Sequence, residues 1–74
     1  SIEYLEQNIE KKHSGFTLIK EGNGSVTVIL ECGALATVSP ENAKGFDFEP
    51  AKLYDFEIVL LGNDNELTEI KPFG

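Results

Sequence analysis

The sequence predicts a small, mainly β domain: a five-stranded barrel with an N-terminal helix and a short helical turn between the third and fourth strands. Three observations lead to this prediction. Hydrophobic residues make up 41% of the 74 residues, which is enough for one compact core and too many for a disordered chain. The apolar spacing changes from helical to alternating after Gly15. Five short strand patterns follow, and closing them into a barrel removes exposed strand edges.

The first predicted element is an amphipathic helix over residues 2–12. Ile2, Leu5 and Ile9 recur at helical spacing and share one stripe, and Gly15 is the predicted stop. A helix of about three turns is marginal alone, so its apolar stripe must pack against something. The stripe is expected either to cap the barrel of the same chain or to form a homodimer interface.

The barrel is predicted to span residues 16–72, and the whole chain, residues 1–74, is one domain. Glu-Gly-Asn-Gly at residues 21–24 favours a hairpin turn. Ser39 as N-cap, Pro40 at the first helical position and Gly45 as terminator predict one short helical turn. The predicted strands cover residues 16–20, 25–31, 34–38, 53–61 and 67–71.

The fourth predicted strand alternates between apolar and charged residues. Asp55 and Glu57 are expected on its outer face. The side chains expected to point the other way, into the barrel, are Tyr54, Phe56, Ile58 and Leu60.

This order of elements, together with Glu-Pro-Ala-Lys-Leu-Tyr-Asp-Phe-Glu-Ile at residues 49–58, resembles the oligonucleotide/oligosaccharide-binding (OB) fold over residues 16–72. The resemblance implies a ligand surface on strands two and three, flanked by two loops. The corresponding residues here are 21–24, 26–38 and 62–66, which contain no aromatic residue and only acidic charges. That composition departs from the stacking platform of an oligonucleotide binder. An SH3-like barrel is the alternative fold.

Cysteine content and hydropathy indicate an intracellular, cytoplasmic protein. Cys32 is the single cysteine and has no partner for an internal disulfide, whereas small secreted domains are usually rich in disulfides. The longest apolar run, residues 58–61, is far shorter than the roughly 18 residues needed to cross a bilayer. No membrane partner is expected.

The charge of the chain restricts its partners. The formal net charge is -7, and all six basic residues are lysines. Binding to DNA or RNA depends on neutralising phosphates, for which arginine is especially suited. We therefore expect no direct binding of nucleic acid, and the predicted partner is a basic site on a protein, such as a nucleic-acid-binding protein.

The sequence offers little for catalysis. His13 is the only histidine, and a surface or helix-capping role is expected for it; Cys32 is expected to be a small buried residue. No Cys/His spacing fits zinc. Asp64, Glu66 and Glu69 superficially suggest a calcium loop, but the required glycine is missing, so a polar turn is expected. We predict no catalytic residue, no cofactor and no metal.

The predicted binding surface combines acidic residues with aromatic anchors, because a basic and partly apolar groove would accept both. The alternative is that Phe46 and Phe48 close one end of the barrel. The predicted protein-binding residues are Asp47, Phe48, Glu49, Asp55, Glu57, Asp64 and Glu66.

The expected function is that of a non-enzymatic acidic module that binds protein. In its size, its charge and its lack of arginine, the chain resembles the small acidic DNA-mimic inhibitors of bacteriophages, which are often dimeric. This resemblance implies a regulator of a replication or transcription protein. One alternative is an OB-type domain that binds single-stranded nucleic acid or a small ligand and stacks it on Phe16, Tyr54 or Phe73. A structural module of a larger protein is a third possibility.

Overall fold

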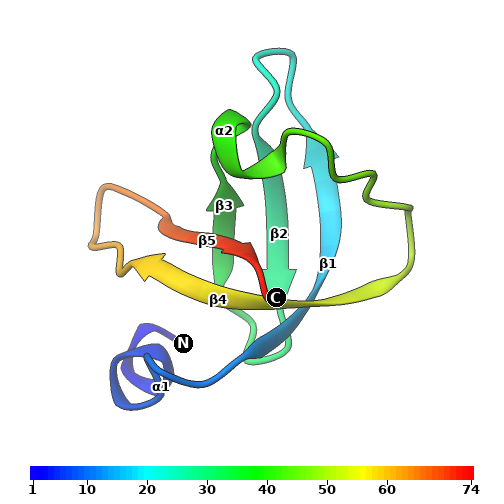
Figure 1. Ribbon diagram of the computed structural model, residues 1–74. Helices are drawn as coiled ribbons and strands as arrows, with labels where there is room; N and C mark the ends of the chain where they lie inside the picture. Colours follow the sequence, from blue (N-terminus) through cyan, green and yellow to red (C-terminus); the bar gives the residue numbers. More distant parts are fainter.

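The computed structural model describes all 74 residues, Ser1–Gly74, and confirms the predicted fold class (Figure 1). The chain is mainly β, with a closed five-stranded barrel in the order β1-β2-β3-β5-β4. The β3–β5 pair is parallel and the other four strand pairs are antiparallel. The elements are α1 (Ile2–Gln7), β1 (His13–Lys20), β2 (Val26–Leu30), β3 (Leu35–Val38), α2 (Pro40–Ala43), β4 (Leu53–Leu60) and β5 (Thr68–Pro72).

The core fills the inside of the barrel, because every second residue of a strand points inward. Val28 on β2 pairs in register with Ala36 on β3, which in turn pairs with Thr68 on β5, and all three are buried. Two core residues come from outside the strands, one from α1 and one from the loop before β4. The buried apolar residues are Leu5, Val26, Val28, Leu30, Ala36, Val38, Phe48, Phe56 and Ile70.

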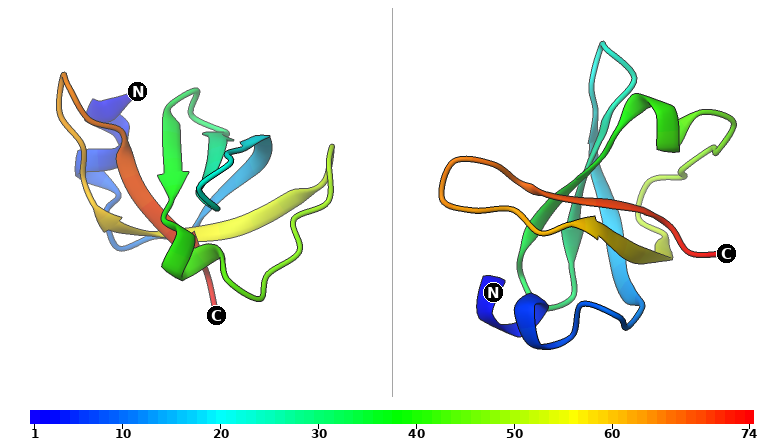
Figure 2. Two further views of the ribbon diagram at one scale, coloured as in Figure 1. Left: turned by 90° about the horizontal axis from the view of Figure 1, so that it is seen from above. Right: turned by 60° about the vertical axis from the view of Figure 1, so that its left-hand side comes forward.

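Two predicted local motifs are confirmed. The β1–β2 connection is a hairpin turn in which the amide of Glu21 donates to the carbonyl of Ser25, and Gly24 has the positive φ that the turn requires. At α2, the Ser39 hydroxyl accepts a hydrogen bond from the Asn42 amide at 3.2 Å, and Pro40 occupies the first turn. The two helices lie at opposite ends of the barrel (Figures 1 and 2). Neither has the length and apolar character needed to cross a membrane.

The N-terminal helix is shorter than predicted, because Asn8 ends it. The Asn8 side-chain amide donates to the Tyr4 carbonyl at 2.8 Å, and the Asn8 carbonyl accepts from His13 Nε2 at 2.9 Å. These bonds replace the continuation of the helix, so Ile9 lies beyond it. Gly15 is therefore not a helix stop. It belongs to β1, where a Cβ atom would lie 2.8 Å from the Ile29 carbonyl oxygen.

Two irregularities change which side chains face outward. The register of β1 shifts at Leu18, and both Leu18 and Ile19 are exposed there. The register of β4 shifts at Val59, and Leu60 beyond it is 62% exposed. Extra residues of this kind shift the alternation of a strand. The prediction that Leu60 points into the barrel with Phe56 was therefore wrong.

Candidate functional site

Four of the seven predicted binding residues form ion pairs with lysines. We call these four carboxylates, Asp47, Glu49, Asp55 and Glu57, the paired acidic residues. The Nζ–carboxylate distances range from 3.2 to 3.9 Å, for the pairs Lys20–Asp47, Lys52–Glu49, Lys12–Asp55 and Lys71–Glu57. The Glu49 carboxylate, through a hydrogen bond and Coulombic attraction, also raises the pKa of the Lys52 ammonium above its ordinary value. A partner cation would have to compete with these lysines.

The other two predicted acids, Asp64 and Glu66, lie elsewhere. They occupy the β4–β5 hairpin, where Asn63 and Glu66 form an isolated bridge and Asn63 Oδ1 accepts from the Asn65 amide. Both are exposed and neither forms an ion pair with a lysine. The hairpin and the loop before β4 project on opposite sides of the molecule (Figures 1 and 2). The structure therefore does not bring the seven residues together on one surface.

Phe48 is part of the core and not an exposed anchor. Its side chain is 1% exposed, and its ring lies 5.8 Å from that of Phe56 and 5.2 Å from that of Tyr54 between centroids. The neighbouring Phe46 packs on it at 4.4 Å and remains exposed. Phe48 thus closes the barrel, as the alternative interpretation expected, and is not available to a partner in this structure.

The apolar stripe predicted for dimerisation also packs within the chain. Leu5 is fully buried in the core, and Ile2 is half-buried against it. Ile9 is exposed but lies outside the helix, so the three residues do not form one interface. The helix caps its own barrel, which was the alternative to dimerisation.

The structure instead exposes an apolar surface on the outside of the barrel. Leu53 on β4 pairs with Phe16 on β1, Phe16 with Ile29 on β2, and Ile29 with Leu35 on β3. Residues paired in this way point to the same side of a sheet, so they form a continuous row across four strands. Phe16, Leu35 and Leu53 are 40%, 47% and 48% exposed. With the neighbouring residues of β1, the surface consists of Phe16, Leu18, Ile19, Ile29, Leu35 and Leu53, and we call it the outer face.

The lysines that adjoin the outer face are neutralised by ion pairs, whereas the acids that adjoin it are not. Lys20 and Lys52, which adjoin it in sequence, pair with Asp47 and Glu49. Glu21 at one end of the β1–β2 hairpin and Glu31 at the end of β2 form no ion pair. The outer face was missed by sequence analysis because it combines residues of four strands, and only the register reveals their alignment. The bulge at Leu18 was also not predicted.

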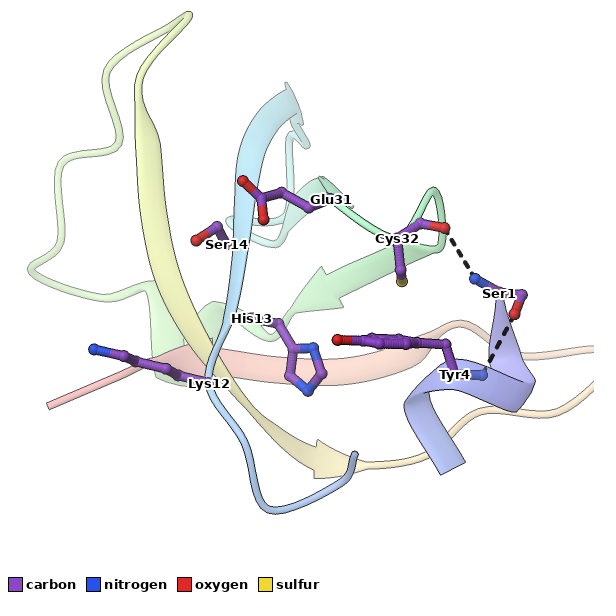
Figure 3. A pocket seen from close by; sticks show the side chains of 7 residues that line it. All are labelled: Ser1, Tyr4, Lys12, His13, Ser14, Glu31 and Cys32. Carbon is purple, nitrogen blue, oxygen red and sulfur yellow. Dashed lines mark hydrogen bonds between the residues drawn. The ribbon is translucent and has the colours of Figure 1, made fainter. Parts of the chain in front are cut away.

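An open pocket lies at the end of the outer face nearest α1 (Figure 3). Its volume is about 520 Å³, and it forms between α1, the start of β1 and the β2–β3 turn. The hydroxyl end of the Tyr4 ring points toward the neighbouring His13 ring, with ring centroids 6.1 Å apart and an interplanar angle of 87°. The lining residues are Ser1, Tyr4, Lys12, His13, Ser14, Glu31 and Cys32.

The predictions for His13 and Cys32 hold only in part. His13 is 8% exposed and therefore buried, although it does bond to the carbonyl of Asn8, the C-cap residue of α1. Cys32 is half-buried and lines the pocket, and its carbonyl accepts from the Ser1 amine at 3.0 Å. No three His, Cys, Asp or Glu side chains gather closely enough to hold a metal ion. No protein-family model, curated protein or solved structure matches the chain significantly.

Proposed function

We propose that this chain is a non-enzymatic binding module whose acidic surface engages a basic site on a protein, and that it regulates or inhibits a nucleic-acid-handling protein in this way. The outer face carries the proposal: six exposed or half-buried apolar side chains lie together, and the acids at its ends are unpaired. Contiguous apolar surfaces with polar borders are typical of sites that bind other proteins.

The charge distribution supports a basic partner. The chain has 13 acidic residues and six lysines, and four of each form ion pairs, which leaves nine acids and two lysines without one. The electrostatic potential around the molecule is therefore negative, and it would attract cationic proteins and repel phosphates. A basic site that attracts this chain also attracts the phosphates of DNA, so the chain and DNA should compete for it.

The chief alternative is an OB-type domain that binds single-stranded nucleic acid or a small ligand. The strand order and the parallel β3–β5 pair are compatible with an OB-like barrel, whose ligand surface includes strands two and three. Phe16, on the neighbouring strand, is exposed and could stack a base. The other two candidates are engaged: Tyr54 packs against Phe48, and the Lys12 ammonium lies 5.6 Å from the Phe73 ring. The two lysines that adjoin the outer face in sequence, Lys20 and Lys52, already form ion pairs, which weighs against this alternative.

The proposal is tested by immobilising the chain, passing host lysate over it and eluting with rising salt. A basic protein is expected to elute at moderate salt, and double-stranded DNA is expected to displace it at constant salt. The control is the double variant Phe16→Ser/Leu35→Ser, which should retain at least tenfold less of the basic protein. The reason is that apolar anchors contribute much of the binding energy of an interface. Retention that neither salt nor DNA reduces would contradict the proposal.

A gel-shift experiment with single-stranded DNA at low salt distinguishes the proposed function from the OB-type alternative. We expect no shift from the wild-type chain. Tight binding that is lost in Phe16→Ser would favour the OB-type function and overturn the one proposed here.

A further inference from the structure

Strand β1 is paired on both sides along only half of its length. On one side it pairs with β2 as far as Lys20, whereas on the other side only its first four residues, His13–Phe16, pair with β4. Because β4 begins at Leu53, residues 17–20 have no strand on that side. An unpaired strand edge presents backbone donors and acceptors to which a strand of another chain can bind. We call residues 17–20 the free edge.

Hydrogen bonds near the two ends of β1 show which backbone groups point away from β2. The Ser14 carbonyl accepts from an amide just after β2, and the Glu21 amide donates to a carbonyl just before it. Both residues therefore face β2, and neighbouring residues of an antiparallel strand bond to opposite sides. The count is made from each end because the register shifts at Leu18. It follows that the backbone groups of Thr17 and Lys20 point to the unpaired side.

Thr17 lacks a partner for its side chain as well. Its Oγ1 is the one buried side-chain oxygen or nitrogen of the structure without a hydrogen bond. No backbone hydrogen bond joins the free edge to the loop before β4, residues 44–52. Since buried polar groups are nearly always bonded, Thr17 marks a position where the fold leaves hydrogen-bonding capacity unused.

The loop before β4 lies beside the free edge without closing it. Figure 1 shows this loop on the side of β1 opposite β2. Asp47 forms an ion pair with Lys20 at 3.6 Å, and their side chains remain 95% and 54% exposed. An ion pair this exposed contributes little to stability. Glu21, next to the free edge, has no lysine partner and makes the local charge negative.

The side chains of the free edge are mostly apolar and belong to the outer face. Leu18 and Ile19 are 53% and 54% exposed, and both follow directly on Phe16. Soluble proteins usually protect strand edges by keeping them short, by bulges or by charged side chains. Here the edge is short and its register shifts at Leu18, so it can accept only a short segment. Its single charged side chain, Lys20, is already paired with Asp47.

We propose that the basic partner binds here with a short extended segment, whose backbone bonds to Thr17 and Lys20 and whose apolar side chains extend the outer face. Addition of a strand to a sheet edge is a common mode of peptide recognition. This inference rests on the proposed function and adds the conformation of the partner segment. The continuity of the free edge with the outer face and the unpaired Glu21 favour a basic segment over a second copy, because two copies with a net charge of -7 each would repel.

The free edge is tested first in the chain alone, by amide hydrogen exchange followed with NMR. The amides of Thr17 and Lys20 should exchange at least about tenfold faster than those of Gly15 and Ile19, which bond to β4 and β2. Equal protection of all four amides would overturn the proposal, because the edge would already be bonded.

Binding is tested with the probe peptide acetyl-Lys-Val-Lys-Val-Lys-Val-amide, which alternates basic and apolar residues. Saturable NMR shifts are expected at the amides of Thr17, Leu18 and Lys20, together with slower exchange at Thr17 and Lys20. A peptide of the same charge with two valines replaced by proline cannot form the ladder and should bind about tenfold more weakly. Equal binding of the two peptides would overturn the proposal.

Two variants of the chain test the backbone contact itself. Lys20→Pro removes one outward amide, and the matched control Lys20→Ala removes the same charge but keeps that amide. Proline is tolerated at edge positions whose amide is unbonded, so the first variant should fold. It should bind the probe about two- to tenfold more weakly than Lys20→Ala, the range for one backbone hydrogen bond. Equal affinities would contradict the proposal. If Lys20→Pro does not fold, the exchange rates and the two peptides decide with the wild-type chain.

The two proposals fail in distinguishable ways. A lysate protein that Lys20→Pro and Lys20→Ala retain equally would refute the strand pairing and leave the proposed function intact. A chain that binds the probe but captures no salt-eluted basic protein would refute the proposed function and leave the pairing. A dimer in light scattering that Lys20→Pro abolishes and Lys20→Ala retains would identify a second copy as the occupant and overturn the proposal of a basic segment.

Discussion

The paired acidic residues and the outer face look similar in the sequence but differ in the structure. Both regions alternate apolar and polar residues along short segments. In the loop before β4, the aromatic Phe48 is buried and the flanking Asp47 and Glu49 have lysine partners. On β1–β3, the aromatic Phe16 is exposed and Glu31 at the border has no such partner.

This comparison shows why a count of acids does not locate a binding surface. A carboxylate already paired with a lysine contributes little to the field that a partner experiences, whereas an unpaired one contributes fully. An exposed aromatic ring is available to a partner, whereas a buried one stabilises the fold. The region richest in acidic and aromatic residues is therefore the less suitable binding surface.

The largest expected difference between the two regions is in stability. Phe48→Ala should cost about 3–5 kcal/mol because it leaves a cavity in the core. Phe16→Ala should cost about 1–2 kcal/mol because its ring is only partly buried. Urea denaturation followed by circular dichroism measures both. If Phe48→Ala leaves too little folded protein, Phe48→Leu should still cost more than Phe16→Leu; equal losses would contradict the core position of Phe48.

The second largest effect on stability is expected at Gly15, the residue of β1 that precedes Phe16 of the outer face. Gly15→Ala should destabilise the chain by about 1–3 kcal/mol, because the new methyl group would press on the Ile29 carbonyl and Val28 where β1 and β2 pair. Gly22→Ala in the hairpin turn is the matched control, since no atom lies within 4 Å of the added methyl, and should change stability by less than about 0.5 kcal/mol. Thermal unfolding of the two variants measures the difference; a neutral Gly15→Ala would mean that the strands separate more easily than this structure indicates.

A smaller effect separates paired from unpaired acids. Glu57→Gln removes the ion pair with Lys71 and should cost about 0.2–1 kcal/mol at low salt. Glu31→Gln removes no ion pair and lowers the net negative charge, so it should be neutral or slightly stabilising. The difference in unfolding free energy between the two variants should shrink as sodium chloride screens the pair. A difference that is independent of salt would show that Glu57 acts through packing instead.

The smallest expected effect is a change in the pKa of the Lys52 ammonium. Its raised pKa should be measurable by NMR at the side chain and should fall toward the ordinary value in Glu49→Gln. Because the folded-state pKa is the higher one, any stabilisation by this pair is complete at neutral pH and is lost as the pH rises through the folded-state pKa. An identical Lys52 titration in both proteins would show that the pair does not persist in solution.

Local patterns in the sequence were sufficient to predict the order of the helices, strands and turns. The hairpin at Gly24 and the capped turn at Ser39 were predicted because each depends on residues next to each other in the chain. The alternation around Phe56 identified β4 for the same reason. The early end of α1 at Asn8 was missed because it depends on a hydrogen bond from His13, which belongs to the following strand.

The sequence by itself determined the mainly β class, the order of the elements and the excess of acids over bases, because these depend on composition and local spacing. Tertiary structure decided that Leu5 and Phe48 belong to the core, that four acids pair with lysines, and that Phe16 stands in one row with Ile29, Leu35 and Leu53. Each of these facts depends on residues far apart in the chain, and their neighbourhood is set by barrel closure and strand register rather than by any local pattern.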